Sequence, residues 1–193
     1  MFTGIVEDIG IVDAIEQKKN LYTLSLRASK IAKGIKLGES VAIDGVCLTV
    51  TKAKGSVLFF DIMKETLDKT TMGTLHSGSK VNLERAMQAT SRFGGHFVTG
   101  HVDGLGRILN IVREKNYVEF QIAVPRPLKR FIVAKGSICV NGISLTVGKI
   151  QKNGFSVYMI PFTMQVTTMA DKKSGDVFNI EADILARYIL NQK

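Results

Sequence analysis

An internal repeat constrains the fold of this chain more than any other feature of its sequence. Residues 44–50 (DGVCLTV) recur as residues 141–147 (NGISLTV), 97 positions further along. The same offset relates residues 70–72 to residues 167–169, and an offset of 96 relates the segment TGIVE near the start to TGHVD. Chance does not preserve one spacing through several separated matches, so the chain is a tandem duplication of a unit of nearly 100 residues.

Each unit has the pattern of a small β-domain. Glycines and polar turns separate short apolar or alternating runs at residues 21–26, 40–43, 56–61, 117–122, 137–140 and 156–160. Several short strands at even spacing predict a barrel or a sandwich, and a closed barrel would leave no exposed strand edge. We therefore predict an all-β chain with one domain in residues 1–96 and another in residues 97–193, joined near Gly94 and Gly95.

The C-terminal tail departs from this pattern. Between Asp183 and about residue 192, the apolar residues Ile184, Leu185, Tyr188 and Ile189 recur at helical spacing. They predict a short helix with one apolar stripe. The stripe either covers its own barrel or packs against a copy of itself in an oligomer, because so short a helix is not stable alone.

Composition indicates a folded chain without a nucleic-acid or membrane role. Of its 193 residues, 45% are hydrophobic and 22% are charged, which supplies a core and excludes intrinsic disorder. The net charge is +9, but the basic residues are scattered among turns without the basic–aromatic alternation of nucleic-acid binding surfaces. No apolar run approaches the roughly 18 residues of a membrane span.

The termini and the cysteines bear on the compartment. Glu7 and Asp8 stand near the start, where a signal peptide would have Lys or Arg. Cys47 and Cys139 form no CxxC pair and no disulfide framework, which fits a reducing environment. We expect the chain to be cytoplasmic.

Familiar catalytic motifs are missing from the sequence. There is no phosphate-binding loop, no dinucleotide-binding glycine fingerprint and no zinc-protease or serine-hydrolase signature. His96 and His101 are five positions apart, which suits neither one face of a helix nor one face of a strand, so we predict no metal site. His76 lies in a polar turn and is most simply a surface residue.

Two differences set the halves of the chain apart chemically. Residues 94–104 hold His96 and His101 among glycines, whereas the equivalent segment of the first unit has no histidine. Imidazole moves protons near neutral pH, and glycine lets the backbone approach a ligand closely. Cys47 and Ser144 are equivalent, so a thiol in one unit corresponds to a hydroxyl in the other. The alternative is that these residues have structural roles only. In that case the histidines would form hydrogen bonds within the fold, and Cys47 would be a small buried apolar residue.

The opening residues MFTGIVE, the pair DGVCLTV and NGISLTV, and the segment GGHFVTGHVDG together resemble the riboflavin synthase family. The resemblance covers the whole chain. It implies two six-stranded Greek-key barrels related by pseudo-two-fold symmetry, and a C-terminal helix that helps to assemble a homotrimer. It also implies the dismutation of two 6,7-dimethyl-8-ribityllumazine molecules, in which a four-carbon unit moves between them to give riboflavin and 5-amino-6-(D-ribitylamino)uracil. Neither a metal nor another cofactor takes part.

The resemblance implies two substrate pockets, and in the family the first barrel of one subunit faces the second barrel of a neighbour. The first pocket would consist of Gly4, Ile5, Val6, Cys47, Leu48, Thr49, Asp61, Ile62, Met63, Lys64, Glu65 and Thr66. The second pocket would consist of Gly100, His101, Val102, Lys135, Ser144, Leu145, Thr146, Tyr158, Met159, Ile160, Pro161, Phe162 and Thr163.

Catalytic roles are assigned on the same resemblance. His101 would transfer the proton of the acidic C7 methyl group of the lumazine, with His96 in support. Ser144, Thr146 and Cys47 would position the substrate, add to its ring or activate water there.

Two departures from the family pattern affect these roles. Asn141 stands where many members have Asp, and an amide has no negative charge with which to polarise a substrate. Phe162 stands where members tend to have a polar residue, whereas Glu65 keeps one in the first unit.

The alternative function is a non-catalytic antenna protein on the same fold, which binds lumazine without converting it. Such a protein would be expected to lose the histidines and the contrast between Cys47 and Ser144, which this chain keeps. Lumazine synthase is a further candidate partner.

Overall fold

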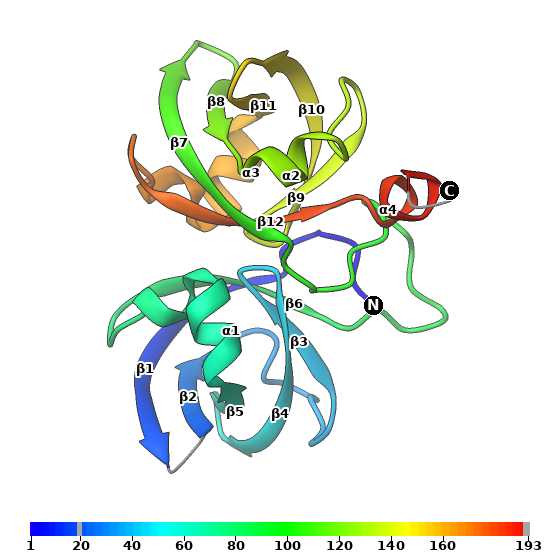
Figure 1. The fold of residues 1–193 in the computed structure, drawn as a ribbon. Helices are drawn as coiled ribbons and strands as arrows, with labels where there is room; N and C mark the ends of the chain where they lie inside the picture. Colours follow the sequence, from blue (N-terminus) through cyan, green and yellow to red (C-terminus); the bar gives the residue numbers. More distant parts are fainter. Residues whose placement is uncertain (19–20, 191–193) are drawn as a thin grey trace.

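The two repeats form two closed antiparallel β-barrels, one above the other in Figure 1. The structure is a computed structural model, and it describes residues 1–18 and 21–190. The strands of the first barrel are β1 (Asp8–Lys18), β2 (Leu21–Arg27), β3 (Ser40–Ile43), β4 (Val46–Lys54), β5 (Val57–Met63) and β6 (Lys80–Arg85). Those of the second are β7 (Gly104–Arg113), β8 (Val118–Ala123), β9 (Ser137–Val140), β10 (Ile143–Gln151), β11 (Gly154–Met159) and β12 (Val177–Ala182).

Both barrels have the same strand order. In the first, β2 pairs with β5 rather than β3, and β3 lies between β4 and β6. In the second, β8 pairs with β11, and β9 lies between β10 and β12. This is the Greek-key arrangement that the family resemblance implies. The runs singled out from the sequence become β2, β3, β5, β8, β9 and β11, with ends shifted by at most two residues.

Each barrel has its own apolar core, built from the inward positions of alternating strands. In the first barrel Leu24, Leu58 and Phe60 are fully buried, and in the second Phe120 and Phe155 are. Alternation sends every second side chain outward, so the polar partners of these residues remain on the barrel surface. The fully buried cores therefore fix the strands on which the outward-facing polar side chains are placed.

Short helices follow equivalent strands in the two repeats. Helix α1 (Lys64–Lys69) follows β5, and helix α3 (Pro161–Val166) follows β11; each leads into a 3₁₀ turn, η1 (Thr71–Thr74) or η2 (Thr168–Asp171). A further single turn, α2 (Arg126–Lys129), is specific to the second barrel. Within residues 1–18 and 21–190, no helix is long and apolar enough to cross a lipid bilayer.

The barrels meet at two equivalent turns on the pseudo-two-fold axis. Asn82 donates from its backbone to the Asp44 carboxylate at 2.8 Å and from its amide to the Asn141 carbonyl at 2.9 Å. Asn179 does the converse, donating from its backbone to the Asn141 side chain at 2.8 Å and from its amide to the Asp44 carbonyl at 2.9 Å. The two side-chain amide bonds therefore cross-link the repeats, and the two backbone bonds tie each asparagine to the turn of its own barrel.

Two segments run antiparallel between the barrels: residues 2–6, the first strap, and residues 98–102, the second strap. Phe2 and Val98 exchange backbone hydrogen bonds of 2.7 and 3.1 Å, and both side chains are fully buried. In Figure 1 the blue N-terminal segment lies beneath β12 before it enters β1. The straps are therefore part of the contact between the barrels.

The predicted C-terminal helix is present in the described residues. Helix α4 spans Ile184–Leu190, and residues 191 and 192 of the predicted helix lie outside the described residues. Tyr188 and Ile189 are both 69% exposed, and none of the residues of α4 is buried. The apolar stripe therefore does not cover its own barrel, which was one of the two expectations for it.

Candidate functional site

Equivalent strands separate at the mouth of each barrel. The ladder between β4 and β5 runs from Val50–Phe60 to Lys54–Val57, so residues 47–49 and 61–63 lie beyond its end. The ladder between β10 and β11 begins at Val147–Val157, which leaves residues 144–146 and 158–160 beyond its end in the same way. Along these two openings, the backbones of the two flanking strands are not paired with one another. The openings coincide with the segments that the sequence assigns to the two pockets.

Strand alternation decides which of the predicted side chains face each opening. Along β4 and β10, Cys47, Thr49, Ser144 and Thr146 are partly or fully exposed. Along β5 and β11, the outward residues are Asp61, Met63 and Tyr158. In contrast, Leu48, Ile62 and Met159 are buried in the barrel cores. Leu145 is partly buried and packs against the core of the second barrel. These four residues can offer a ligand mainly their backbone.

The first strap crosses from its own repeat to the second barrel. The Ser144 backbone donates to the Gly4 carbonyl at 2.8 Å, and Val6 packs against the core of the second barrel. Gly4 has a φ of +77°, and a Cβ there would lie 2.6 Å from the Ser144 Cβ, so only glycine fits. The assignment of Gly4, Ile5 and Val6 to the Cys47 pocket is therefore wrong: they belong to the Ser144 opening.

The second strap makes the reciprocal crossing. The Cys47 backbone donates to the Gly100 carbonyl at 2.9 Å, and Val102 packs against the core of the first barrel. Gly100 has a φ of +80°, and a Cβ there would lie 2.5 Å from the Cys47 Cβ. Gly100, His101 and Val102 thus line the Cys47 opening, and their predicted place beside Ser144 is also wrong.

His96 and Ser144 form a polar pair at the opening of the second barrel. The His96 Nδ1 lies 2.7 Å from the Ser144 Oγ, and the His96 backbone donates to the Thr3 carbonyl at 3.1 Å. His96 is 7% exposed, and burial lowers the pKa of its imidazole, against the opposing effect of Asp183. Its Nε2 is buried and has no hydrogen-bond partner within the described chain. A neutral imidazole in this position can accept a proton from the hydroxyl or from a ligand.

Cys47 and the His101 segment occupy the opening of the first barrel. Cys47 is half-buried, and the His101 backbone accepts a hydrogen bond of 3.2 Å from Arg187 of helix α4. The His101 ring is exposed and makes no hydrogen bond within the part of the chain that the structure describes. Each opening therefore has one histidine nearby, and the buried, hydrogen-bonded one is His96 rather than His101.

Most of the remaining predicted residues lie just after β5 and β11, where the chain leaves the two openings. Lys64 and Glu65 begin helix α1 and form ion pairs with Asp68 and Lys69, so Glu65 already has a partner within the chain. Phe162 is 66% exposed and Ile160 is 58% exposed. The other positions are Thr66 and Thr163, which lie half-buried in their helices, and Pro161 and Lys135, which are exposed.

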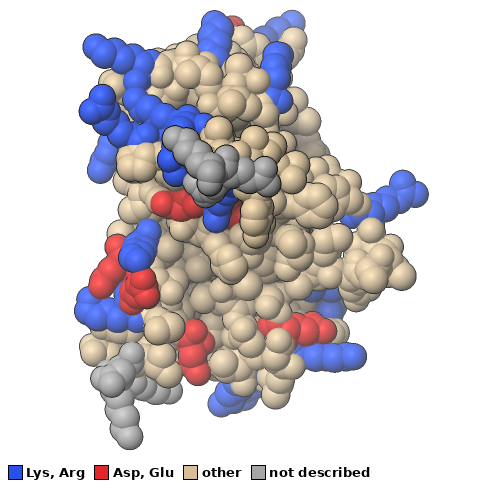
Figure 2. Space-filling view, turned by 45° about the vertical axis from the view of Figure 1, so that its right-hand side comes forward, with Lys and Arg blue, Asp and Glu red and all other residues tan. Residues whose placement is uncertain are grey.

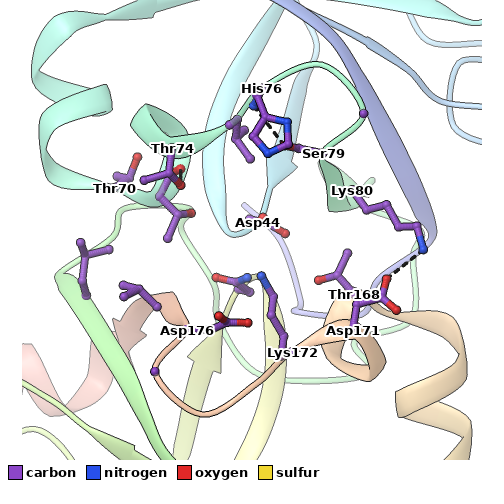
Figure 3. A pocket seen from close by; sticks show the side chains of 17 residues that line it. Asp44, Thr70, Thr74, His76, Ser79, Lys80, Thr168, Asp171, Lys172 and Asp176 are labelled. Atoms are coloured by element: carbon purple, nitrogen blue, oxygen red, sulfur yellow. Dashed lines mark hydrogen bonds and ion pairs between the residues drawn. The ribbon is translucent and has the colours of Figure 1, made fainter.

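A further cavity lies elsewhere, between the barrels at the 3₁₀ turns. It measures about 690 Å³, and Asp44, Asn141, Thr168 and Lys172 are among its lining residues. Figure 3 shows the Asp44 carboxylate and the Lys172 side chain pointing toward one another across it. Burial raises the pKa of Asp44 to about 7, although the Asn82 hydrogen bond and Lys172 both oppose this. Asn141 thus stands at the barrel contact, opposite Asp44, and lines a different cavity from Ser144, which could not be inferred from the sequence.

Charge and potential metal ligands give no competing site. Figure 2 shows Lys and Arg side chains distributed over both barrels, with acidic side chains between them. Across residues 1–18 and 21–190, no group of three or more His, Cys, Asp and Glu side chains has an arrangement suited to a metal ion. The two barrel openings remain the candidate site.

The chain is similar to a known domain family and to proteins of known activity. The model of the lumazine binding domain family matches residues 3–86 and 99–183, one copy for each barrel. The chain is 43% identical over 189 residues to the riboflavin synthase of Actinobacillus pleuropneumoniae, covering 98% of this chain and 88% of that protein. It is 40% identical to the riboflavin synthase of Bacillus subtilis (strain 168), with the same coverage.

Two solved structures of LumP are also similar to this chain in fold and in sequence. The crystal structure of LumP complexed with 6,7-dimethyl-8-(1'-D-ribityl) lumazine aligns with a TM-score of 0.85 at 27% identity, covering 94% of this chain and 99% of that one. The crystal structure of LumP complexed with riboflavin aligns with a TM-score of 0.86 at 28% identity, with the same coverage.

Proposed function

This chain belongs to the riboflavin synthase family, and we propose that it catalyses that family's dismutation of two 6,7-dimethyl-8-ribityllumazine molecules. One lumazine gives up a four-carbon unit, made of two ring carbons and their methyl groups, and becomes 5-amino-6-(D-ribitylamino)uracil. The other accepts the unit and becomes riboflavin. The atoms of the two substrates equal those of the two products, so no external oxidant or reductant is needed.

The observation that supports this proposal best is the presence of two equivalent openings with different chemistry. One has the Cys47 thiol and the strap that includes His101; the other has the Ser144 hydroxyl bonded to His96. Two identical substrates must take unequal roles as donor and acceptor, and unequal pockets provide that difference. Holding both molecules in place also removes much of the entropic barrier to their encounter.

His96 and Ser144 are our candidates for proton transfer at the second barrel. The imidazole is held neutral by burial, because the pKa of His96 is lowered, and its Nδ1 lies within hydrogen-bond distance of the Ser144 Oγ. The pair can take a proton from a bound lumazine or from water at its ring. His101 would serve the same purpose at the first barrel, where its exposed ring is free to meet a substrate.

A homotrimer is part of the proposal. The apolar side chains of Leu185, Tyr188 and Ile189 on helix α4 are between 56% and 69% exposed, and Met63 and Phe162 beside the two openings are similarly exposed. Burying such residues is worth about 1.5–3 kcal/mol each for the aliphatic ones, which favours contact with other copies of the chain. We also expect a cytoplasmic location. A further expectation is association with lumazine synthase, and coelution of the two proteins would test that association.

The experiment is incubation of the purified chain with the lumazine while riboflavin fluorescence is followed. We expect one riboflavin for every two lumazines consumed. The matched variants are His96→Ala, which removes the buried imidazole, and Glu114→Gln, which changes an exposed turn residue and is expected to retain full turnover. Saturable lumazine binding without any flavin product would instead favour the antenna function. The 40–43% identity to riboflavin synthases, against 27–28% to LumP, favours the enzyme.

A further inference from the structure

Two buried glutamates hold the straps. Glu84 on β6 is 6% exposed, and its carboxylate accepts hydrogen bonds from the Thr3 backbone, the Thr3 hydroxyl and the Gly4 backbone at 2.7, 2.8 and 2.9 Å. Glu181 on β12 is 2% exposed and accepts the equivalent three bonds from Thr99 and Gly100 at 2.7, 2.6 and 2.9 Å. The two clamps are related by the pseudo-two-fold axis.

Each clamp acts across the barrel contact. Glu84 belongs to the first barrel, but the strap that it holds includes the Gly4 carbonyl, which accepts a hydrogen bond from the Ser144 backbone of the second barrel. Glu181 belongs to the second barrel, and its strap includes the Gly100 carbonyl, which accepts a hydrogen bond from the Cys47 backbone of the first barrel. The Thr3 carbonyl also accepts from the His96 backbone.

We propose that Glu84 and Glu181 are positioning residues, each fixed in one barrel and each setting the geometry of the other barrel's opening. Glu84 positions the strap beside Ser144 and His96, and Glu181 positions the strap beside Cys47. Neither carboxylate meets the substrate.

The hydrogen-bond donors of each strap favour a charged carboxylate in each clamp, against the opposing effect of burial. Burial raises the pKa of both Glu84 and Glu181, and the strap hydrogen bonds oppose that effect in each case. The charge of Glu7 also raises the pKa of Glu84, whereas the charge of Arg187 lowers that of Glu181. Three donors aimed at one buried carboxylate favour its ionised form, since hydrogen bonds to charged groups are stronger than those between neutral groups.

Glutamine variants test the proposal, because glutamine keeps the shape but replaces one acceptor oxygen with an NH₂ donor. Glu84→Gln should speed amide hydrogen exchange at Ser144 by tenfold or more and leave Cys47 unchanged. Glu181→Gln should do the reverse. Glu114→Gln, an exposed change in a turn, should affect neither amide.

Thiol alkylation gives a second readout. Cys47 is half-buried, whereas Cys139 is buried and burial raises the pKa of its thiol well above the ordinary value, so iodoacetamide should report on Cys47 alone. We expect alkylation of Cys47 to be about tenfold faster in Glu181→Gln and unchanged in Glu84→Gln. Equal responses of both openings to either variant, or no response in a folded variant, would overturn the proposal.

Folding and function are separated from positioning by two further measurements. Urea unfolding identifies a variant that fails to fold. If Glu84→Gln fails, Thr3→Val replaces it, and if Glu181→Gln fails, Thr99→Val replaces it. Each valine removes one hydrogen bond of the clamp. Lumazine titration rests on the proposed function: each glutamine variant should weaken one of the two sites by about tenfold. A change in exchange and alkylation without any lumazine binding would uphold the clamps and refute the proposed function.

Discussion

Replacing Asp44 with asparagine is expected to stabilise the protein above neutral pH. The Asp44 carboxyl is buried at the barrel contact, and its pKa rises from an ordinary 3.8 to about 7. At the equivalent position of the second repeat, the Asn141 side chain accepts the same backbone hydrogen bond, from Asn179 at 2.8 Å. An asparagine at position 44 can therefore keep the bond to Asn82 without the buried charge.

The sign follows from the proton balance of the two states. Below pH 3.8 the carboxyl is protonated whether the chain is folded or unfolded, so it contributes no pH dependence. Between pH 3.8 and about 7 only the unfolded state is ionised, and the free energy of unfolding falls as the pH rises. Each tenfold change in proton affinity is about 1.4 kcal/mol, so the full loss above pH 7 is on the order of 4 kcal/mol.

The assay is urea unfolding of the wild type and Asp44→Asn at pH 4.5, 6 and 8, at one protein concentration because oligomerisation contributes to stability. We expect a gain of about 1 kcal/mol at pH 4.5 and about 4 kcal/mol at pH 8, and the latter corresponds to roughly 10 °C in Tm for a chain of this size. Asp171→Asn is the control of opposite sign, because the Lys80 ion pair lowers the pKa of that exposed carboxyl. A gain of equal size at pH 4.5 and pH 8 would refute the reasoning.

Three further predictions concern catalysis and assembly. His96→Ala and His101→Ala should each lower turnover by about 10²–10⁴-fold with little change in lumazine affinity, measured by single-turnover fluorescence beside a thermal midpoint; a destabilised but fully active variant would show that the imidazole is only structural. Protein treated with a chelator and freed of small molecules should convert lumazine at an unchanged rate, and an absolute requirement for added metal would contradict this. Truncation after Asp183 removes the exposed stripe of α4, so sedimentation should show a monomer in place of a trimer, whereas an intact trimer would assign the contact to other surfaces.

The fold could be predicted from the sequence because repetition and alternation are local signals. The recurrence of DGVCLTV as NGISLTV identifies two copies of one domain, and the even spacing of short apolar runs indicates closed sheets. The number and order of strands came only with the family resemblance. The exposure of the α4 stripe could not be predicted, because apolar spacing gives the face of a helix and not the surface that it meets.

The segments predicted to form the pockets lie at the two barrel openings, but the straps contact the opposite barrels from those predicted. Sequence offset shows that Gly4 is equivalent to Gly100, but it gives no information about which barrel either residue meets. That choice depends on long-range packing: Val6 fits the core of the second barrel and Val102 fits that of the first. The bond between His96 and Ser144, which are 48 positions apart, is likewise a product of the crossed first strap.

Crossed straps bear on how such a chain can arise and be divided. A fragment that contains only the first repeat would keep residues 2–6 but lose Ser144, the partner of Gly4. Two identical fragments could complete one another by exchanging arms in a homodimer with true two-fold symmetry, and this chain has the form of such a dimer joined covalently. In a homodimer every substitution appears twice. Covalent joining releases that constraint, so Cys47 and Ser144, or Asp44 and Asn141, can differ within one molecule.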